Sequence, residues 1–441
     1  MVRSRIGDRH VLAVRTMAVV IGKMTKRAFP AASRSVAIAL AVTAACTGCS
    51  LGLGAGASSV PRASVAAAPS SAVTASTGPT GKPASTSPAS SAPASCPQRV
   101  FNSMTEAQRV GQLFLVGVPS DAATSQVVTA VDDYHLGSVL LTATSASVAT
   151  LAGGTAGIQA LATQQATGGV RFLVAANQEG GEIQQLSGSG FSAMPSELVQ
   201  GQSSLATERS DAAQWGSELK AAGVNLDLAP VMDVVPEATA STNAPIGELD
   251  REFGYDPVTN GTHGAAFIEG MAQAGVAATA KHFPGLGRVA GNTDFTSGVT
   301  DTVTTPDDPN LGSFQDAVNA GVPFVMIALA LYTQIDPAHF AVFSPTVIQT
   351  MLRQRMGFSG VVMSDDLGEA AQVQNMSDGA RAVDFLNAGG DLVTSQVIAP
   401  AEAMATAVLA DANSSASFRA EVTAADMKIL AAKQALGLLP C

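Results

Sequence analysis

The chain has 441 residues, of which 46% are hydrophobic and 13% are charged, so it can bury a large core and is not a disordered protein. The formal net charge is -11, but the first 49 residues hold eight of the 24 basic residues and one acidic residue. The rest of the chain therefore has 34 acidic against 16 basic residues, a balance of -18. Nucleic acids and anionic headgroups require clustered Lys and Arg, so we exclude nucleic acid as a partner.

A short apolar segment near the N-terminus has the pattern of a signal peptide. Residues Ser35 to Ala45 are largely apolar, follow several basic residues and precede small residues. About 20 apolar residues are needed to cross a bilayer, so this segment predicts export rather than a permanent transmembrane helix. The leader before it is long, and Met24 would be a more ordinary start.

The apolar segment ends in Thr43-Ala-Ala-Cys46-Thr-Gly-Cys49, which resembles the lipobox of bacterial lipoproteins. In that motif a cysteine after two small residues is acylated and becomes the new N-terminus, and both Cys46 and Cys49 qualify. We expect residues 1–49 to be a signal peptide with a lipobox, and the protein to be lipid-anchored at the outer face of the cell membrane or partly secreted. The Cys-x-x-Cys spacing also occurs in redox and zinc motifs, but no partner pair and no βαβ pattern accompany it.

Residues 50–95 are almost entirely Ser, Ala, Pro, Thr and Gly. Ordering such a segment costs entropy that no buried apolar surface offsets. We therefore expect a disordered linker between the leader and one folded domain, residues 96–441.

From Cys96 onward, short apolar strands alternate with helix-length stretches, which is typical of a parallel α/β fold. A capping box at Ser103-Met-Thr-Glu106 predicts the first helix, and Ala424–Leu438 is the predicted last helix. Eight β/α units in about 345 residues favour one (β/α)8 TIM-type barrel with long active-site loops. A doubly wound sheet is the alternative. The predicted strands are Leu113–Val118, Gly137–Leu141, Arg171–Ala176, Leu226–Val231, Val276–Lys281, Phe324–Leu331, Gly360–Met363 and Asp391–Thr394.

Polar side chains follow four of these strands. Asn177 follows the third, Asp233 the fourth, Lys281-His282 the fifth and Asp365-Asp366 the seventh. Since the chemistry of a barrel sits at the carboxyl ends of its strands, we expect these residues to converge. We predict a functional role for Asp365 and a helix-capping role for Asp366.

Together these motifs resemble the family 3 glycoside hydrolases, specifically the β-N-acetylglucosaminidase branch. The similarity runs through most of residues 100–395, and the joint order of the motifs is more specific than any one of them. The segments that carry it are Met104-Thr-Glu-Ala-Gln-Arg-Val-Gly-Gln-Leu-Phe, Asn177-Gln-Glu-Gly-Gly, Leu228-Ala-Pro-Val-Met-Asp233, Arg251-Glu-Phe-Gly-Tyr-Asp-Pro257, Lys281-His-Phe-Pro-Gly-Leu-Gly287 and Met356-Gly-Phe-Ser-Gly-Val-Val-Met-Ser-Asp-Asp-Leu367.

The resemblance implies a retaining mechanism in which Asp365 attacks the anomeric carbon and forms a covalent glycosyl-enzyme. Arg251, Lys281 and His282 match family positions that hold sugar hydroxyls, and multi-donor cations suit that task. With Asn177 and Asp233 they form the predicted substrate site. The alternatives are an ion pair of the two cations with a barrel carboxylate such as Asp233, and a core role for the histidine.

The sequence departs from the family pattern around the acid/base. Leu286 replaces the usual His after Pro-Gly, Asn177 replaces an Asp, and Asn292-Thr-Asp294 replaces Asp-Ser-His, whose His is the acid/base. Asp294 aligns with that His, and an aspartic acid can serve if burial or a like charge raises its pKa. A flexible loop could bring Asp294 close to Asp365, as retaining chemistry requires. The alternative is a turn or capping role in the Gly291-Asn-Thr-Asp loop.

These features predict an exo-glycosidase that removes β-linked N-acetylglucosamine from cell-wall or chitin-like oligosaccharides. The altered acid/base loop leaves two alternatives: a catalytically impaired sugar-binding lipoprotein, and a family 3 hydrolase with β-glucoside preference. We expect no cofactor and no metal, because no His, Cys and carboxylate set has ligand spacing. An oligosaccharide is the expected partner and a monomer the expected state.

Cys96 and Cys441 border the folded region, and residues 97–440 contain no cysteine. The first and last units of a closed barrel are neighbours, so the two thiols should meet and pair in an oxidising compartment. Chain entropy for so long a loop gives a stabilisation of about 4–5 kcal/mol. The alternative is a free thiol on a disordered tail.

Overall fold

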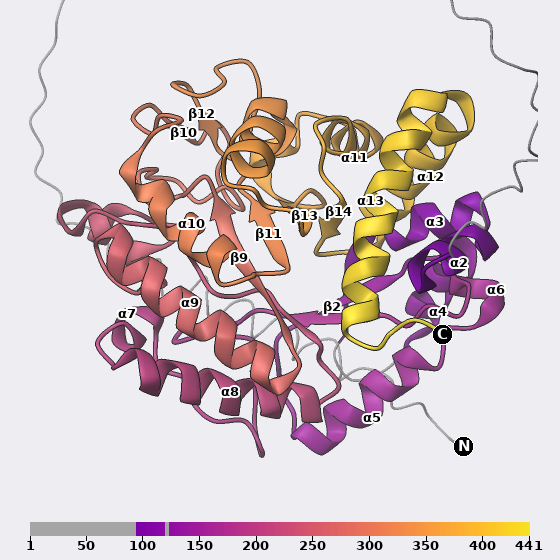
Figure 1. Cartoon of the computed structure of the whole chain (residues 1–441), viewed down its shortest axis with the longest axis horizontal. Coiled ribbons are helices and arrows are strands. Elements are labelled where there is room, and N and C mark those ends of the chain that lie inside the picture. Colours follow the sequence, from indigo (N-terminus) through magenta and orange to yellow (C-terminus); the bar gives the residue numbers. More distant parts are fainter. Residues whose placement is uncertain (1–93, 120–122) are drawn as a thin grey trace, which may run out of the picture. The chain divides into compact units, whose positions relative to one another are not determined.

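The computed structural model describes residues 94–119 and 123–441. The predicted signal peptide, the lipobox cysteines Cys46 and Cys49 and most of the predicted linker lie outside these ranges. Eight parallel strands close into a barrel in their order along the chain, and helices surround it (Figure 1). This confirms the predicted (β/α)8 barrel over the doubly wound alternative.

All eight predicted strands are present, and most are shorter than predicted. The predicted strand Leu226–Val231 ends at Asp227, and Val231 rejoins the sheet as a single bridge to Lys281. Pro230 lies in this interval and has no N–H for a ladder hydrogen bond. The barrel strands are β1 (Phe114–Val118), β2 (Ser138–Leu141), β4 (Leu173–Ala176), β8 (Leu226–Asp227), β9 (Ala277–Phe283), β11 (Phe324–Ile327), β13 (Val361–Asp366) and β14 (Leu392–Ser395).

Nine helical segments follow the barrel strands in the described chain, and the one after β11 is a π-helix. They are α4 (Ser125–Tyr134), α5 (Val148–Gln159), α8 (Leu205–Ala221), α9 (Pro257–Ala274), α10 (Gly312–Asn319), the π-helix η5 (Thr346–Arg355), α11 (Asp378–Asn387), α12 (Ile398–Ser414) and α13 (Ala416–Ala435). Shorter elements are α2 (Cys96–Ser103), α3 (Glu106–Gln112), α6 (Gln164–Thr167), α7 (Glu197–Gln200), η1 (Glu237–Thr242), η2 (Gly247–Leu249), η3 (Pro309–Leu311), η4 (Ala341–Phe343) and η6 (Ala371–Val373).

Three small two-stranded sheets lie in the loops, and one of them carries a residue of the candidate site described below. They are β3 (Thr144–Ser145) with β7 (Leu186–Ser187), β5 (Gln178–Gly180) with β6 (Ile183–Gln184), and β10 (Thr300–Asp301) with β12 (Leu331–Tyr332).

Two helix ends differ from the prediction. The first capping box is Thr105 with Gln108, because Ser103 is still inside α2, where its hydroxyl donates to the carbonyl of Val100. The last helix begins at Ala416 rather than Ala424, and Ser415 caps it by accepting from the backbone N–H of Phe418.

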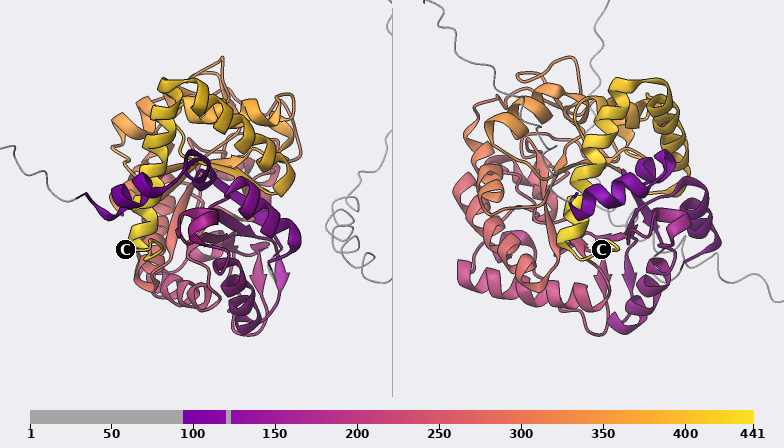
Figure 2. Two further views of the ribbon diagram at one scale, coloured as in Figure 1. Left: turned by 90° about the vertical axis from the view of Figure 1, so that its right-hand side faces the viewer. Right: turned by 45° about the vertical axis from the view of Figure 1, so that its right-hand side comes forward.

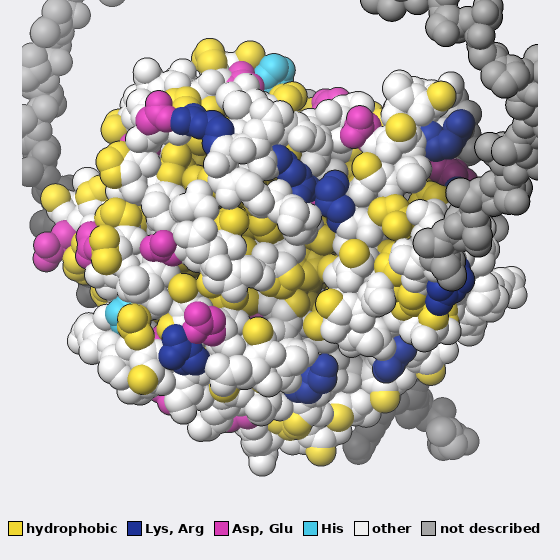
Figure 3. Space-filling view, viewed as in Figure 1, with side chains coloured by type: hydrophobic (Ala, Val, Ile, Leu, Met, Phe, Trp, Pro, Cys, Tyr) yellow, Lys and Arg dark blue, Asp and Glu magenta, His cyan; other side chains and the backbone are white. Residues whose placement is uncertain are grey.

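The core is the barrel interior and the layer between the strands and the helices. The strand residues of β1, β2, β4, β11 and β14 are buried throughout, which explains their continuous apolar runs. On the face seen in Figure 3, Lys and Arg side chains stand among other residues and form no continuous basic patch. No helix in the described ranges has the length and apolar character needed to cross a membrane.

The two ends of the described domain meet. Helix α2 packs against α13, and the C-terminus lies beside them (Figure 2). A disulfide joins Cys96 and Cys441, whose Cα atoms are 6.1 Å apart. The structure therefore contains the predicted bridge.

Candidate active site

A buried carboxylate, Glu179 on β5, is the centre of the polar residues at the barrel mouth. Arg251 binds it with two hydrogen bonds, from Nε to Oε2 at 2.7 Å and from Nη2 to Oε1 at 2.9 Å. The Nζ of Lys281 lies 2.6 Å from Glu179 Oε1 and donates to Asn177 Oδ1 at 2.9 Å. Three of the five predicted substrate residues, Asn177, Arg251 and Lys281, are thus in direct contact around this one anion.

The local backbone explains why glycine follows this carboxylate. Gly180 has a φ of 109°, and a Cβ there would lie 2.0 Å from the carbonyl oxygen of Pro195. Only glycine fits both conditions. The segment around Pro195 therefore packs directly against the backbone of β5, next to the buried Glu179.

The ionisation of Glu179 follows from its partners. Burial alone would raise its pKa, but the charges and hydrogen bonds of Arg251 and Lys281 outweigh burial and lower the pKa to about 2. The sequence left open an ion pair of the two cations with a barrel carboxylate such as Asp233. They do form such an ion pair, with Glu179 rather than Asp233, because β5 follows directly on the end of barrel strand β4.

A second buried carboxylate, Glu197 at the start of α7, lies beside this cluster. Its two oxygens accept from the backbone N–H of Val231 at 3.1 and 3.2 Å. Burial and the negative charge of Glu179 raise the pKa of Glu197 well above its usual range. Neither glutamate is among the site residues predicted from the sequence. Glu179 had a detectable signal, since two predicted cations need a counterion and it stands in the Asn177-Gln-Glu-Gly-Gly motif, whereas Glu197 had none.

Asp233 and His282 form a second contact pair. His282 Nδ1 lies 2.7 Å from Asp233 Oδ2, and Asp233 Oδ1 accepts from the backbone N–H groups of His282 and Leu286 at 3.2 and 2.8 Å. A carboxylate oxygen can only accept, so Nδ1 of His282 donates in this bond. Leu286 joins the pair through its backbone, and its own side chain is buried in the core.

Asp365 and Asp366 at the end of β13 have different surroundings. Asp366 Oδ1 accepts from the N–H groups of Gly368 and Gln396 at 2.8 and 3.0 Å, and its Oδ2 from Glu369 at 3.1 Å. Asp365 accepts one backbone bond, from Asp366 to its Oδ1 at 2.8 Å. The predicted helix cap at Asp366 is wrong, because a turn follows β13 and α11 begins only at Asp378.

Asp294 lies on a loop that is folded against the segment after β13. The backbone N–H of Ala371 donates to the carbonyl of Asp294 at 3.1 Å, and that of Gln372 to Thr293 at 3.1 Å. Burial, then the charges of Asp365 and Asp366, raise the pKa of Asp294 to about 7, against the opposing charges of Arg251 and Lys281. The charge of the predicted nucleophile, Asp365, therefore contributes to the raised pKa of Asp294.

The other described histidines lie elsewhere. His135, between α4 and β2, contacts the carbonyl of Ala166, and His263 contacts two carbonyls from within α9. His339 is exposed and paired with Asp336. In the ranges that the structure describes, no group of three or more His, Cys, Asp or Glu could hold a metal ion.

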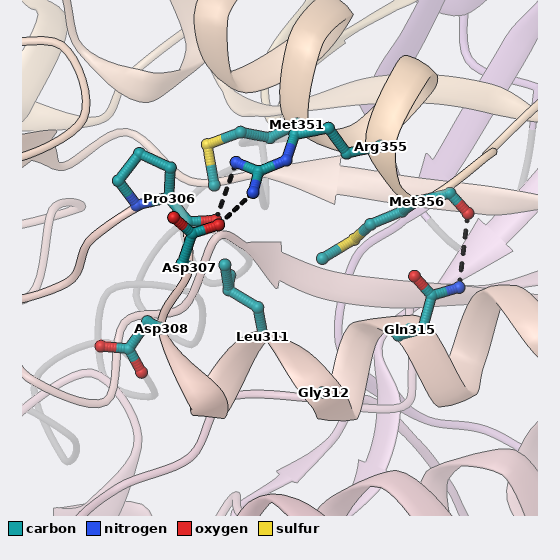
Figure 4. A pocket seen from close by; sticks show the side chains of 9 residues that line it. All are labelled: Pro306, Asp307, Asp308, Leu311, Gly312, Gln315, Met351, Arg355 and Met356. Atoms are coloured by element: carbon teal, nitrogen blue, oxygen red, sulfur yellow. Dashed lines mark hydrogen bonds and ion pairs between the residues drawn. The ribbon is translucent and has the colours of Figure 1, made fainter.

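A surface hollow of about 330 Å³ lies between the η3–α10 segment and η5 (Figure 4). Arg355 reaches across it to Asp307, with which it forms an ion pair, and Met351 and Met356 form its apolar part. None of the predicted site residues lines this hollow, so it is separate from the residues at the barrel mouth.

Comparisons of the sequence with known proteins point to one family. Residues 105–429 match the glycosyl hydrolase family 3 N-terminal domain. A β-hexosaminidase of Stenotrophomonas maltophilia (strain K279a) is 37% identical over 232 residues, which cover 50% of this chain and 66% of that protein. The match to this relative therefore spans about two thirds of its length.

Solved structures agree with this match. A β-N-acetylhexosaminidase from Beutenbergia cavernae DSM 12333 is 45% identical with a TM-score of 0.74, and the match covers 75% of this chain and 99% of that one. A glycoside hydrolase family 3 β-N-acetylglucosaminidase from Paenibacillus sp. str. FPU-7 is 28% identical with a TM-score of 0.68, covering 76% and 63%.

Proposed function

Because the chain belongs to glycosyl hydrolase family 3, we propose that it is a retaining exo-β-N-acetylhexosaminidase. It removes β-linked N-acetylglucosamine from oligosaccharides. The observation that carries this proposal is the pair of carboxyl groups at the barrel mouth. Asp294 has a pKa raised to about 7, and Asp365 is the neighbouring carboxylate whose charge contributes to that shift. Two neighbouring carboxyl groups in different protonation states can divide the roles of acid and nucleophile.

In the first step, a carboxylate oxygen of Asp365 attacks the anomeric carbon and the glycosidic C–O bond breaks. The protonated carboxyl of Asp294 gives its proton to the departing oxygen. In the second step, Asp294 takes a proton from water, the water oxygen attacks the anomeric carbon and the ester to Asp365 breaks. Each group returns to its starting protonation state.

The cluster around Glu179 holds the sugar. Lys281 donates two of its three N–H bonds to protein oxygens, which leaves a donor for a sugar hydroxyl. Arg251 is anchored by Glu179 and by the carbonyl of Pro245, at 2.7 Å from Nη1, so its planar group is fixed before substrate arrives. Asn177 and the Asp233–His282 pair complete the set of hydroxyl partners.

The preference for N-acetylglucosamine rests on the relatives, which are named for N-acetylhexosaminides. Cell-wall fragments or chitin-like chains are the proposed sources of substrate, since the leader predicts export. Lipidation of Cys49 or Cys46 would hold the barrel at the outer face of the cell membrane. Loss of lipid labelling in the Cys46→Ser/Cys49→Ser double variant would support the anchor, and unchanged labelling would reject it.

Two alternatives each have an observation that favours them. Leu286 and the Asn292-Thr-Asp294 loop differ from the family pattern, and a sugar-binding lipoprotein without turnover could tolerate such changes. A β-glucosidase is the other alternative, because Asn177 brings no charge to the sugar.

Hydrolysis of 4-nitrophenyl β-N-acetylglucosaminide and β-glucoside by the purified protein separates these functions. Turnover of the first substrate supports the proposal, and preference for the second supports the β-glucosidase. Binding of N-acetylglucosamine by calorimetry, with no turnover of either substrate, would establish the sugar-binding protein.

A further inference from the structure

The loop that carries Asp294 is fastened at both ends by one buried residue, Gln372 on η6. Its side chain accepts from the backbone N–H of Val299 and donates to the Val299 carbonyl, both at 2.9 Å. Its backbone N–H donates to Thr293 at 3.1 Å, and the preceding N–H of Ala371 donates to Asp294. Gln372 is 2% exposed, so these bonds are protected from water.

The segment that holds the loop is itself braced on the nucleophile's strand. Arg381 donates to the carbonyl of Gly368 at 3.0 Å and also contacts that of Leu367. Asp366 accepts from the backbone N–H groups of Gly368 and Glu369 in the same turn and from that of Gln396 directly after β14. The turn after β13 is therefore a fixed support, and Gln372 connects it to the opposite loop.

Besides Gln372, the backbone N–H of Leu331 donates to the Val299 carbonyl at 3.1 Å, and the Asn292 carbonyl accepts from Phe295 and Thr296 inside the loop. Residues 295–298 are exposed, and Gly298 has a φ of 74° with open space around it. Gly291 stands at the other end. Glycine-flanked, exposed loops of this kind move easily, and such loops commonly close over active sites.

We propose that Gln372 is a positioning residue that holds the Asp294 loop closed over Asp365, so that the acid stays within reach of the leaving oxygen. This inference rests on the proposed function. Gln372 touches neither the substrate nor the reacting atoms, and it acts through the position of Asp294. A glutamine suits the task, because one amide supplies both the acceptor for the Val299 N–H and the donor for its carbonyl.

Gln372→Met tests the proposal, because methionine has a similar length but makes neither bond. Gln374→Met is the matched control in the same segment. Gln374 is exposed, and its amide donates to the carbonyls of Gly368 and Ala370 rather than to the loop. Each variant is assayed on N,N′-diacetylchitobiose, whose leaving group needs a proton, and on 2,4-dinitrophenyl β-N-acetylglucosaminide, whose leaving group does not.

We expect Gln372→Met to lower kcat/KM on the disaccharide by about 10–100-fold, which is less than the roughly 10²–10⁴-fold of general acid catalysis because the acid is displaced and not removed. The loss on the activated glycoside should be much smaller. Gln374→Met should change both substrates equally and little. A general loss of stability would lower both rates together. An equal loss on the two substrates in Gln372→Met would therefore overturn the proposal.

Gln372→Glu provides a conditional rescue. Its protonated carboxyl can both donate to and accept from Val299, whereas its ionised form can only accept. We expect its disaccharide rate, relative to wild type at the same pH, to be nearly normal at low pH and to fall as pH rises. A ratio that does not change with pH would overturn the proposal.

The Asp294→Ala variant distinguishes the two levels of inference. If it shows the large loss on the disaccharide alone and Gln372→Met does not, Asp294 is the acid and the positioning role is wrong. If neither variant lowers the rate on the disaccharide more than the rate on the activated glycoside, relative to wild type, the proposed acid itself is wrong.

Discussion

The two adjacent aspartates at the end of β13 have different roles because they accept different hydrogen bonds. Asp366 uses both oxygens on three backbone donors and stabilises the turn, while Asp365 accepts a single backbone bond. A carboxylate with unoccupied acceptor positions beside the residues that hold the sugar is available for chemistry. The one-residue difference therefore separates a structural group from the proposed nucleophile.

Asp365→Asn should lower kcat by on the order of 10⁴-fold or more while leaving the fold intact, because an amide cannot form the glycosyl ester. Asp366→Asn is the matched comparison. It should instead lower the free energy of unfolding by about 1–3 kcal/mol, because its amide N–H₂ would face backbone donors. Rates on the activated glycoside measure the loss in Asp365→Asn, and urea unfolding curves measure the loss in Asp366→Asn. Wild-type turnover in Asp365→Asn would refute the nucleophile.

Asp294→Ala should impair disaccharide hydrolysis far more than hydrolysis of the dinitrophenyl glycoside, for which no proton is needed. Azide should partly restore the rate on the activated glycoside, because it attacks the glycosyl-enzyme without a general base. In the wild type, the disaccharide rate needs protonated Asp294. With a pKa of about 7, kcat/KM should therefore fall as pH rises through that value.

The pH dependence gives a further control. The fall near pH 7 should disappear in Asp294→Ala, which has no group to titrate there. Equal losses on both substrates, without azide rescue, would mean that Asp294 has a turn role only.

Sequence reasoning located the proposed chemical groups but not their supports. Asp365 and Lys281 follow long apolar runs, so the barrel geometry placed them at the mouth. Gln372 could not be predicted, because its bonds to Val299 join segments 73 residues apart and no motif marks them. Glu179 was visible as a motif residue, but its pairing depends on the fold of β5.

At the scale of elements, eight predicted strands became a closed barrel because each has a buried apolar run, a pattern local enough to detect in the sequence. The loop sequences contain fewer patterns from which their structure can be predicted. The short sheet β5–β6 folds back over the mouth and brings Glu179 between Arg251 and Lys281, which come from the α9 approach loop and β9. Glu179, Arg251 and Lys281 form a cradle that links three separate elements through one anion.

Glu179 of the cradle and the adjacent buried Glu197 should be energetically coupled. When Glu179 is neutralised by Glu179→Gln, the pKa of Glu197 should fall, because its rise is caused by burial and by the charge of Glu179. Glu197 can then ionise and compensate part of the loss. Glu197→Gln alone should cost little, because the raised pKa of Glu197 favours its neutral form and a glutamine still accepts from Val231.

The double variant should therefore lose more stability than the sum of the single variants, approaching the about 3–5 kcal/mol of an uncompensated buried charge. Urea unfolding at pH 7 measures the cycle. Glu269→Gln, which breaks the exposed pair with Arg209, should change stability by less than about 1 kcal/mol. Additive losses in the cycle would contradict the compensation.

The pH dependence of the cradle has a defined sign. The pKa of Glu179 is lowered from 4.5 to about 2, so its stabilising charge is fully present above about 4.5 and is lost as pH falls towards 2. The stability difference between wild type and Glu179→Gln should shrink over that window.

At the scale of the whole molecule, α2 lies before the first barrel strand and α13 after the last, and they cover each other. A small cluster apart from the main core joins them: Val100, Phe101 and Met104 with Val170 and Leu430. Such a peripheral cluster buries less apolar surface than the barrel, so the terminal helices should be the first part of the domain to open. The disulfide Cys96–Cys441 ties this region together across 345 positions of sequence.

Removal of this bridge by Cys96→Ser/Cys441→Ser should lower the free energy of unfolding by about 2–5 kcal/mol, because an open chain gains more entropy on unfolding than a closed loop of this length. The loss should appear first as faster hydrogen exchange in α2 and α13, which open before the barrel strands. Non-reducing peptide mapping tests the bond in the oxidised protein: trypsin cuts after Arg99 and Lys433, so peptide 434–441 should remain attached to the peptide that ends at Arg99. Wild-type protein treated with reductant should match the double variant in stability and exchange, since both lack the same link. Free 434–441 before reduction would show that the two cysteines do not pair, and equal exchange in variant and wild type would show that the cluster alone holds the ends.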